Sequence, residues 1–317
     1  MFEVREKSVI LENGNEIPLV GFGTWPMKGD ECYHAIRKAI ENGYRHFDTA
    51  FHYQNEDAVG RAINDAIEEK KLTRSDFFVT SKLADHHKMP GTPTKMIDHQ
   101  LEKLGLEYID LYLIHSPWSL VPTEDLLSME KKKDASGKLE MIDTPLTETW
   151  RELEKAIKSL GVSNFSSSQI SDILKICKHR PQMNQVECHP LFPQDELLHF
   201  CHEEKINLTA YSPLGGVSRE IAETKTKNFE FMKNETILKI AAELEKDPAQ
   251  VLLKFQVRRG IIVIPKSAND ERQKSNKDLF SFDFSKEQLA ELESMNGGKE
   301  GRGWTEERVS HSKYFPW

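Results

Sequence analysis

The sequence predicts an α/β protein of the (β/α)8 class, a TIM barrel in which eight parallel strands form a closed ring inside a ring of helices. Short apolar runs alternate with helical patterns along the 317 residues, and this alternation is typical of parallel strands joined by right-handed crossovers. The runs FFVTSKL, YIDLYLIH and IIVIP are apolar on both faces, as strands in a covered parallel sheet are. No linker rich in Pro, Gly or Ser divides the chain, so we expect residues 1–317 to form one domain.

The chain begins with a predicted β-hairpin that precedes the barrel. Apolar runs flank Asn13 and Gly14, and both residue types tolerate the positive φ of a tight hairpin turn. The expected barrel strands are Leu19–Thr24, Arg45–Thr49, Phe77–Leu83, Tyr108–His115, Leu160–Ser163, Met183–Glu187, Asn207–Tyr211 and Ile261–Pro265. The expected helices between them include Cys32–Asn42, Asn55–Lys70, Thr94–Leu104, Ser167–Cys177, Gln194–Lys205 and Glu235–Glu245.

An open doubly wound sheet is the main alternative fold. That fold normally carries a G-x-G-x-x-G phosphate-binding turn after its first strand. Gly21 and Gly23 supply two glycines, but Pro26 stands where the third would be. We therefore interpret the two glycines as a close-packed strand end in a barrel.

Composition and charge exclude several classes of protein. The chain has 43 Lys and Arg against 51 Asp and Glu, a net charge of −8, whereas nucleic-acid binding draws on a basic surface. No apolar run approaches the roughly 18 residues of a membrane helix, and the N-terminus MFEVREKSVI lacks the apolar region of a secretory signal. We expect a cytoplasmic protein that acts on a small molecule, with neither nucleic acid nor membrane as partner. The lack of an obvious exposed apolar segment favours a monomer.

Neither the cysteines nor the histidines form a metal-binding pattern. His86 and His87 are adjacent but have no third ligand in view, so we interpret them as loop residues and expect no metal. The cysteines fit a reducing cytosol, because they are too scattered for a disulfide framework or a zinc site. They are Cys32, Cys177, Cys188 and Cys201.

Polar residues close almost every predicted strand, and in a barrel the chemistry lies at the carboxyl ends of the strands. The second strand reaches Asp48, with Tyr53 five residues further on, the third reaches Lys82 and the fourth reaches His115. A lysine in an apolar run is costly to bury unpaired, and Asp48 on the neighbouring strand can pair with it. A cation beside Tyr53 stabilises tyrosinate, so we expect the pKa of Tyr53 to fall from about 10 toward neutrality.

These four residues together form a predicted site for carbonyl reduction, in which Tyr53 protonates the developing alkoxide and a neutral His115 orients the carbonyl. No side chain supplies a hydride, so a nicotinamide cofactor is needed. Taken alone, Asp48 is also typical of a turn cap, and Tyr53 and His115 of packing residues. Lys82 alone is also typical of a Schiff-base lysine, as in barrel aldolases, which is the main rival chemistry. The combination on consecutive strands favours the reductase.

Six motifs make the sequence resemble the aldo-keto reductase family, specifically its aldose and aldehyde reductase-like members. They are GYRHFDTAFHYQNEDAVG (Gly43–Gly60), LYLIHSP (Leu111–Pro117), LGVSNF (Leu160–Phe165), NQVECHP (Asn184–Pro190), AYSPLG (Ala210–Gly215) and VIPKS (Val263–Ser267). The resemblance runs from about the hairpin to the C-terminus. It implies an NADP(H)-dependent oxidoreductase that reduces aldehydes or ketones to alcohols, with long loops at the C-terminal face of its barrel.

The resemblance also implies the roles of individual residues. The catalytic tetrad comprises Asp48, Tyr53, Lys82 and His115, with Tyr53 as general acid and base. The implied contacts to the nicotinamide cofactor are Gly23, Thr24, Trp25, Ser163, Asn164, Gln185, Tyr211, Ser212, Leu214, Lys266, Ser267, Arg272 and Asn276.

Three of these residues bear on the choice of cofactor. Lys266, Ser267 and Arg272 match the family positions that hold the adenosine 2′-phosphate. A Lys and an Arg make charge-assisted hydrogen bonds to this phosphate, and NAD cannot accept them because it lacks the group. NADP(H) is therefore favoured over NAD(H). Asn276 matches an adenine contact, while its neighbour Ser275 replaces an acid usually found there.

The predicted substrate pocket departs from the family pattern. Trp25 matches a pocket aromatic, but Ala84 and Ser116 replace two tryptophans, and His52 replaces a small apolar residue. Trp118 can refill part of the space. We expect these five residues to line a wider and less aromatic pocket that accepts bulkier or more polar carbonyls.

Two segments differ in length or composition from their surroundings. In Thr147–Phe165 the chain is about five residues shorter than the family pattern, roughly 7 Å of helix; we expect a truncated fourth helix and local destabilisation at the bottom face rather than a changed mechanism. A shifted fifth strand would misplace Ser163 and Asn164. The loop Gly215–Asn234 is expected to form a belt over the cofactor, and the tail Gly297–Trp317 to fold over the barrel mouth.

Two other functions stay open. One is a Schiff-base lyase that uses Lys82. The other is a non-catalytic role, because the same barrel serves as a lens crystallin and as a channel auxiliary subunit. The sequence leaves the physiological carbonyl open among sugars, lipid aldehydes, steroids and xenobiotic ketones.

Overall fold

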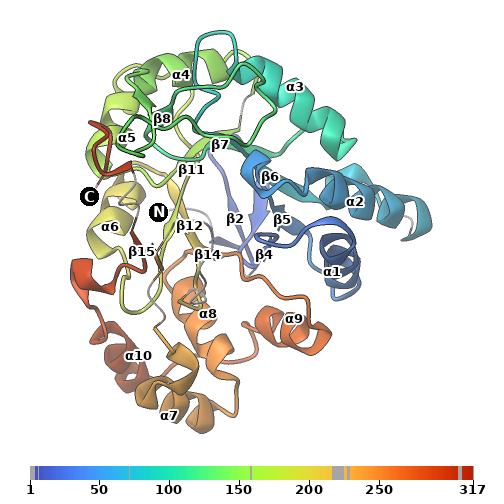
Figure 1. Cartoon of the computed structure of the whole chain (residues 1–317). Coiled ribbons are helices and arrows are strands. Elements are labelled where there is room, and N and C mark those ends of the chain that lie inside the picture. The colour runs from blue at the N-terminus through green and yellow to red at the C-terminus, as the bar shows by residue number, and fades with distance from the viewer. Residues whose placement is uncertain are drawn as a thin grey trace.

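In the computed structural model, eight parallel strands form the centre of the molecule and helices surround them (Figure 1). The structure describes residues 4–5, 7–70, 72–157, 159–215, 225–226, 229–305 and 309–316. The strands are paired in the order β14, β12, β11, β10, β7, β6, β5, β4. Their bounds are β4 Phe22–Gly23, β5 His46–Asp48, β6 Phe78–Leu83, β7 Leu111–Ile114, β10 Leu160–Ser163, β11 Met183–Glu187, β12 Asn207–Tyr211 and β14 Ile262–Val263.

The sheet closes on itself through the residues beside β4 and β14. Val20 forms a parallel bridge with Val263. The Gly21 N–H donates to the Val263 carbonyl oxygen at 2.8 Å, and the Val263 N–H donates to the Leu19 carbonyl oxygen at 2.9 Å. Because both edges are joined, the predicted (β/α)8 barrel is confirmed.

Helices cover the outside of the barrel. They are α1 Gly29–Glu41, α2 Glu56–Lys70, α3 Pro93–Leu104, α4 Leu146–Leu153, α5 Ser167–Leu174, α6 Asp195–Glu203, α7 Glu235–Leu244, α8 Pro248–Arg258, α9 Asp270–Lys277 and α10 Lys286–Glu293. In α1 the buried residues recur at helical spacing, so one face packs on the sheet; they are Cys32, Ala35, Ile36, Ala39 and Ile40. In the described part of the chain, none of the helices combines the length and the apolar character needed to cross a membrane.

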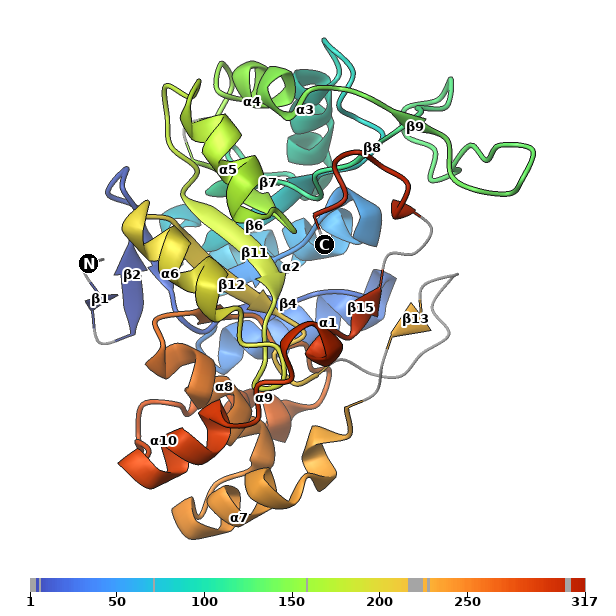
Figure 2. The same cartoon turned by 90° about the vertical axis from the view of Figure 1, so that its left-hand side faces the viewer.

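The N-terminal hairpin lies at one end of the barrel (Figure 2). It contains β2 (Ser8–Ile10) and β3 (Glu16–Pro18), with β1 (Val4–Arg5) paired to β2. Gly14 has φ +85°, and the Leu11 N–H donates to the Asn15 carbonyl oxygen at 2.8 Å. The predicted hairpin is therefore confirmed.

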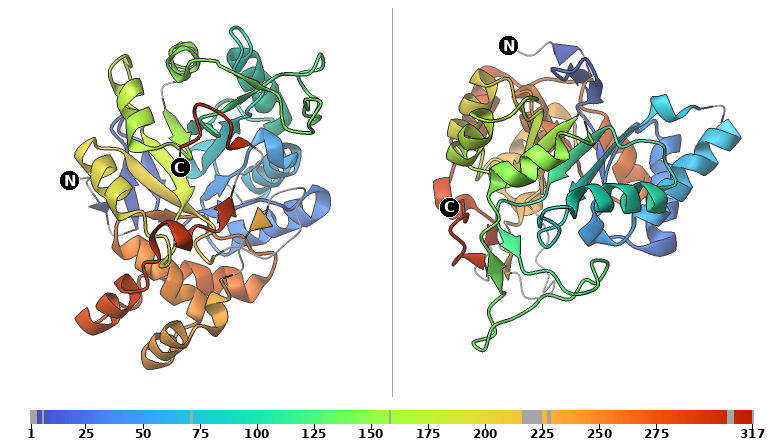
Figure 3. Two further views of the ribbon diagram at one scale, coloured as in Figure 1. Left: turned by 60° about the vertical axis from the view of Figure 1, so that its left-hand side comes forward. Right: turned by 90° about the horizontal axis from the view of Figure 1, so that it is seen from above.

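Two short antiparallel strand pairs lie at the opposite end (Figures 2 and 3). β8 (Ser119–Leu120) pairs with β9 (Met141–Ile142), and β13 (Lys225–Thr226) pairs with β15 (Trp304–Thr305). The remaining short elements are the 3₁₀ turns η1 Phe51–Tyr53, η2 Arg74–Asp76, η3 Phe231–Lys233 and η4 Gly298–Gly301. Most of the predicted belt, at 216–224 and 227–228, lies outside the described residues, as do 306–308 and Trp317 of the tail.

Each predicted strand contains an observed barrel strand, but the first, fourth and eighth are clearly shorter than predicted. Only Phe22 and Gly23 pair with β5, opposite Phe47 and Asp48. A Cβ on Gly23 would lie 2.5 Å from the Ile264 carbonyl oxygen, so this glycine permits close contact between backbones, as expected.

Helices α8, α9 and α10 are absent from the helices named above, and α8 has a clear physical reason. Every residue from Gln250 to Val257 is buried, so α8 lacks the polar face that makes a surface helix visible as a periodic pattern. The sequence nevertheless marks the start of α8, because Asp247 and Gln250 form a capping box and Pro248 lies in the first turn of the helix.

The fourth helix, α4, has eight residues, as do α5, α9 and α10. The truncation relative to the family pattern stays a prediction. A hollow of 650 Å³ lies beside the segment after α4 and is lined by Ile97, Leu101, Ala156 and Ile157 among others. Strand β10 keeps its pairing on both sides, with Leu160 opposite Tyr112 and Ser163 opposite Gln185. The carboxyl end of β10, with Ser163, is therefore in register with its neighbours after this eight-residue helix.

Gly60 offers a direct test of the packing between α2 and α3. A Cβ at this position would lie 1.7 Å from the Leu104 carbonyl oxygen, so Gly60→Ala has to move one helix. We expect a loss of about 2 kcal/mol or more in the free energy of unfolding, measured by urea denaturation. Glu68→Ala, at an exposed position of the same helix, should change it by less than about 0.5 kcal/mol. Equal effects of the two variants would contradict the packing.

Candidate active site

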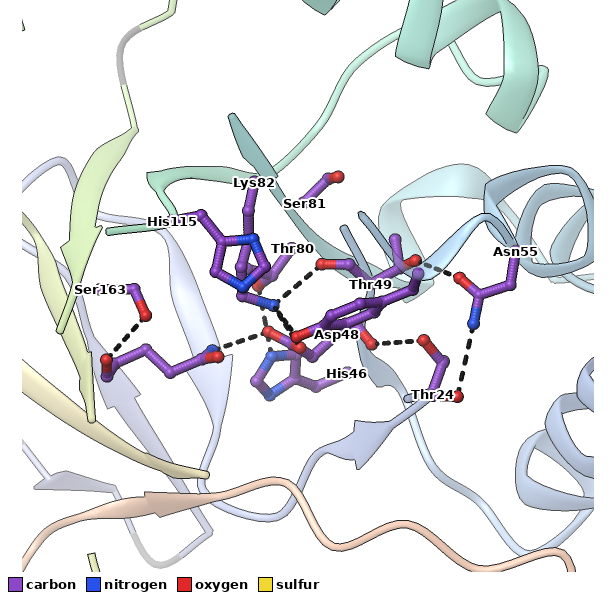
Figure 4. Close-up of polar contacts among 12 residues, drawn as sticks. Thr24, His46, Asp48, Thr49, Asn55, Thr80, Ser81, Lys82, His115 and Ser163 are labelled. Carbon is purple, nitrogen blue, oxygen red and sulfur yellow. Dashed lines mark hydrogen bonds and ion pairs between the residues drawn. The ribbon is translucent and has the colours of Figure 1, made fainter. Parts of the chain in front are cut away.

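A buried ion pair lies at the carboxyl ends of β5 and β6 (Figure 4). The Lys82 Nζ donates to Asp48 Oδ1 at 2.5 Å, to the Thr49 carbonyl oxygen at 2.9 Å and to the Tyr53 hydroxyl at 3.3 Å. The side chain of Lys82 is 0% exposed and that of Asp48 is 3% exposed. All three N–H groups of the ammonium therefore have partners, as a buried charge requires.

Tyr53 and His115 complete the group that the sequence predicted. Tyr53 ends η1, directly after β5, and His115 follows β7. The two rings meet edge-on with centroids 5.8 Å apart. The His115 backbone is fixed on both sides, because its N–H donates to the Leu83 carbonyl oxygen at 3.2 Å and its carbonyl oxygen accepts from Asn164 Nδ2 at 3.0 Å. The structure thus brings all four predicted residues together.

The electrostatics of Tyr53 differ from the sequence prediction. Burial, together with the Asp48 carboxylate, raises the pKa of Tyr53 well above its ordinary value, whereas the sequence predicted a lowered pKa. The physical reason is that Asp48 largely neutralises the field of Lys82 at 2.5 Å, while the cost of burying a phenolate stays in full. Tyr53 is therefore a neutral phenol that can donate a proton.

His115 is neutral, as expected. Burial and the nearby Lys82 ammonium lower the pKa of His115 to about 3. A neutral imidazole carries one N–H and one free lone pair, so it can orient a polar group without adding charge. Burial also lowers the pKa of Lys82, against the opposing effect of Asp48.

The residues assigned to the nicotinamide amide lie at neighbouring strand ends. Gln185 Nε2 donates to Asp48 Oδ2 at 2.7 Å, and the Gln185 carbonyl oxygen accepts from Ser163 Oγ at 2.8 Å. The Tyr211 hydroxyl donates to Asn164 Oδ1 at 2.9 Å. These amide and hydroxyl groups converge beside the ion pair and supply both donors and acceptors, which is the set that a carboxamide needs.

The next residues, Ser212 and Leu214, follow β12. Ser212 Oγ accepts from Trp304 Nε1 at 3.0 Å, and the Trp304 ring also meets Tyr211 and Trp25, with centroids 6.2 and 5.4 Å apart. Leu214 is half-buried against the core. Trp304 therefore connects the tail to the assigned cofactor residues. Beyond Gly23, Thr24 is fully buried and donates its hydroxyl to the Asp48 carbonyl oxygen at 2.9 Å.

The residues assigned to a 2′-phosphate lie beyond β14, at the start of α9. Lys266 is half-buried with its Nζ 3.8 Å from Glu31 Oε1, and Arg272 is exposed in the first turn of the helix. Ser267 and Asn276 are buried nearby, 5% and 4% exposed. Two cations beside a helix N-terminus form a donor set that fits a phosphate.

The five predicted pocket residues occupy different surroundings. Trp25 faces Trp304, and His52 lies between His86 and His115. Ala84 is 0% exposed and belongs to the core. Ser116 and Trp118 are 2% and 6% exposed; Trp118 packs in a small cluster with Leu120, Leu139 and Val309.

Sequence reasoning missed a polar network beneath Ser116 and Trp118. Asp85 accepts from the Ser116 hydroxyl and from Trp118 Nε1, the latter at 3.2 Å. The buried Lys88 ammonium donates to the carbonyl oxygens of Ser116 and Trp118. The signal in the sequence was a charged residue, Asp85, two positions after the last residue of a buried strand.

The tail is held by a second missed residue. The buried Glu187 carboxylate, at the end of β11, accepts the backbone N–H of Gly303 at 2.8 Å and of Trp304 at 3.1 Å. His189 Nε2 lies 3.0 Å from the same carboxylate. Glu187 was visible as the polar end of a predicted strand, but nothing in the sequence indicated its partner 116 residues away.

No group of three or more His, Cys, Asp or Glu side chains in the described ranges is arranged to hold a metal ion. His86 and His87 lie with ring centroids 4.0 Å apart, tilted by 58°. Their rings pack against each other rather than converge on a shared point.

The fold is a closed (β/α)8 barrel with polar residues gathered at the carboxyl ends of its strands. The sequence matches the model of the Aldo/keto reductase family over residues 19–297. It is 38% identical to "Glycerol 2-dehydrogenase (NADP(+))" of Saccharomyces cerevisiae, over 98% of this chain and 96% of that protein. It is also 38% identical to Aldo-keto reductase family 1 member A1 of Mus musculus, over 91% and 89% of the two chains.

The fold is likewise similar to a solved structure. The aldose reductase from Schistosoma japonicum superposes with a TM-score of 0.89 and 35% identity, covering 98% of each chain. The chain therefore belongs to the aldo/keto reductase family and is an oxidoreductase.

Glu56, a further residue that the sequence did not single out, lies behind Lys82. Its Oε1 accepts from Ser81 Oγ at 2.6 Å and from Gln100 Nε2 at 2.7 Å. Burial raises the pKa of Glu56 to about 7, and the two hydrogen bonds and Lys82 oppose the shift. This carboxyl group therefore titrates near neutral pH, close to the ion pair.

We expect Glu56 to make the protein less stable as the pH rises from about 4.5 to about 7. Between these values the native state binds more protons than the unfolded state, so the free energy of unfolding falls with pH. The full cost above pH 7 is at most about 3–4 kcal/mol, from the shift of the pKa at about 1.36 kcal/mol per unit. Glu56→Gln keeps an acceptor oxygen and removes the titration. Urea denaturation at pH 5 and pH 9 should therefore show a smaller pH dependence for the variant, and an unchanged dependence would contradict the assignment.

Proposed function

We propose that the protein reduces aldehydes or ketones to alcohols with NADPH, with Tyr53 as the general acid. The observation that carries this proposal is the Lys82 ammonium, which contacts both Asp48 Oδ1 and the Tyr53 hydroxyl, with the neutral His115 ring beside the phenol. A phenol and an imidazole that meet edge-on form two adjacent hydrogen-bonding groups for one carbonyl oxygen.

The chain's own residues then have distinct tasks. Bound NADPH would supply a hydride to the carbonyl carbon. Tyr53 donates its proton to the carbonyl oxygen as negative charge develops there, and the Lys82 ammonium, 3.3 Å from the Tyr53 hydroxyl, donates a hydrogen bond to the phenolate that remains. His115 is a neutral imidazole, so it orients the carbonyl by a hydrogen bond without adding a charge to the site. Asp48 holds the ammonium in position through Oδ1.

The cofactor is proposed from the donors at two places in the barrel. Ser163, Asn164 and Gln185 would hold the carboxamide. Lys266 and Arg272 would hold the 2′-phosphate that distinguishes NADPH from NADH. The relative from Saccharomyces cerevisiae carries NADP(+) in its name, which supports the same choice.

A Schiff-base lyase is supported less well by the geometry. The Lys82 Nζ is fully buried and all its N–H groups have partners. Its nitrogen therefore has no lone pair available to attack a carbonyl carbon. The net charge of −8 supports a small-molecule substrate rather than nucleic acid, and we propose action as a monomer in the cytoplasm.

The central test of the function is NADPH oxidation over a panel of aldehydes and ketones with the wild type and Tyr53→Phe. We expect the wild type to turn over at least one carbonyl and the variant to lose kcat by about 10²-fold or more, because the proton donor is missing. NADPH affinity, measured by fluorescence, should change little. Equal kcat in both proteins would refute the acid assignment, and no turnover of any carbonyl by the wild type would favour a non-catalytic role.

The cofactor preference can be tested separately by binding. Arg272→Ala should weaken NADPH binding about 10-fold or more and NADH binding less than about 2-fold, because only NADPH carries the phosphate. Lys274→Ala is a matched control: this lysine lies on the same helix and pairs with Asp270 and Glu271, so its loss should leave the Kd for both cofactors unchanged. An equal loss for both cofactors in Arg272→Ala would contradict the 2′-phosphate assignment.

A further inference from the structure

Two buried charged residues that the proposed reaction does not use lie in the loop after β6. Asp85 is 7% exposed and Lys88 is 1% exposed. Burial lowers the pKa of the Lys88 ammonium to about 8, against the opposing effect of the Asp85 carboxylate. Burying a charge is costly unless the group is paired and hydrogen-bonded. The partners of these two groups therefore indicate what they do.

Both groups bind the segment that follows His115. The Asp85 carboxylate accepts from the Ser116 hydroxyl and, at 3.2 Å, from Trp118 Nε1. The Lys88 ammonium donates to the carbonyl oxygens of Ser116 and Trp118. Four hydrogen bonds from two residues thus fix both the side chains and the backbone of this segment. We call Asp85 and Lys88 the clamp.

His115 depends on such an anchor because its own ring is held only weakly. Nδ1 of His115 is buried and has no hydrogen-bond partner among the described residues, whereas the second nitrogen of a functional histidine is often fixed by a carbonyl or carboxylate oxygen. Ring contacts take its place, with centroids 5.8 Å from Tyr53 and 5.3 Å from His52. The direction of the ring therefore depends on the backbone at His115, and Ser116 is the next residue along it.

The clamp can hold His115 in place without charging its ring. Burial and the Lys82 ammonium lower the pKa of His115, and the two charges of the clamp act on it in opposite directions, because Asp85 raises this pKa and Lys88 lowers it. A carboxylate and an ammonium together add no net charge near the imidazole. The imidazole therefore stays neutral, with one N–H and one lone pair for orienting a carbonyl group.

We propose that Asp85 and Lys88 are positioning residues for carbonyl reduction, which act through His115 by fixing the segment that follows it. This inference rests on the proposed function, because it assigns the carbonyl oxygen to Tyr53 and His115. Without Lys88, two buried carbonyl oxygens after His115 lose their donor, and the ring is no longer held beside Tyr53. Such a shift is costly for catalysis, because a displacement of about 1 Å can lower a rate by about 10²-fold.

The test is a double-mutant cycle between Lys88 and His115. Lys88→Met keeps the length of the side chain but removes the charge and the donors. For a carbonyl compound that the wild type reduces, we expect kcat and kcat/KM to fall together by about 10-fold. In a His115→Ala background the same change should lower kcat by less than about 2-fold, because the residue through which Lys88 acts is absent. Equal losses in both backgrounds would show a merely structural role and overturn the proposal.

Asp85→Asn tests the other half of the clamp and is the milder change, so it carries the cycle if Lys88→Met does not fold. Asparagine keeps the size of the side chain but has an NH₂ group in place of one acceptor oxygen. Ser116 or Trp118 therefore loses its acceptor. We expect kcat to fall about 5- to 10-fold with His115 present and less than about 2-fold in the His115→Ala background. A loss that persists without His115 would contradict the positioning role of Asp85.

Lys254 on α8 provides a matched control. It is a buried lysine, 7% exposed, with its Nζ 3.9 Å from Asp283 Oδ1. Lys254→Met also removes a buried charge, but it should leave kcat within about 2-fold in both backgrounds. In every variant the NADPH Kd, by fluorescence, should stay within about 2-fold of wild type, and urea denaturation should show a folded protein under the assay conditions.

The outcomes separate this inference from the function on which it rests. A loss of kcat in the clamp variants that requires His115 supports the positioning role. If the wild type reduces carbonyl compounds and the clamp variants keep its kcat, the positioning role is refuted while the proposed function stands. No reduction of any carbonyl compound by the wild type would overturn both.

Discussion

The buried ion pair between Asp48 and Lys82 is the interaction on which the rest of the site depends. Lys82 uses its three N–H groups on Asp48, on the backbone and on Tyr53, while Asp48 uses its second oxygen on Gln185. Removing one partner of such a pair typically costs 3–5 kcal/mol, because the other charge is left buried alone. The pair therefore ties strand β6 to β5 and, through Gln185, to β11 across the barrel.

The closed barrel is what permits this arrangement. Parallel pairing places the carboxyl ends of all the strands at one end of the molecule. There, Asp48 on β5 lies opposite Thr80 on β6. Thr80 comes two residues before Lys82, so Lys82 lies just beyond Asp48 at the same end of the sheet. The same geometry brings His115 and Asn164 beside the pair, although they are 67 and 116 residues from Asp48 in the sequence. The short α4 does not disturb this end, because β10 keeps its register with both neighbours.

Much of this could be predicted from the sequence, because strand ends in a parallel barrel share one location. Apolar runs that end at or next to Asp48, Lys82 and His115, with Tyr53 five residues after Asp48, were enough to predict that these four residues lie together. Helix α8 was missed because a helix buried on nearly all sides has no polar face. The pKa of Tyr53 was predicted in the wrong direction, because the sequence shows that Lys82 is near but not how closely Asp48 cancels its charge.

Other parts of the site depend on contacts that no local pattern reveals. Glu187 holds the tail, and Glu56 lies behind Lys82, yet both are ordinary acids in the sequence. His52 and His86 are distinguished only in the folded chain, where His52 lies beside His115, His86 stacks on His52, and ring nitrogens of both lack a hydrogen-bond partner among the described residues. Burial and pairing of polar atoms are properties of the folded chain, and they separate a structural residue from a functional one.

The central claim is that burial and a neutralised ion pair keep Tyr53 as a protonated phenol, ready to act as an acid. Its most direct test is the absorbance of tyrosinate near 295 nm in the cofactor-free protein, titrated for the wild type and for Tyr53→Phe. The account predicts that the two titrations coincide from pH 6 to about 10, since Tyr53 does not ionise in that range. A wild-type step between pH 7 and about 8.5 that is absent from the variant would show an acidic phenol and contradict the account.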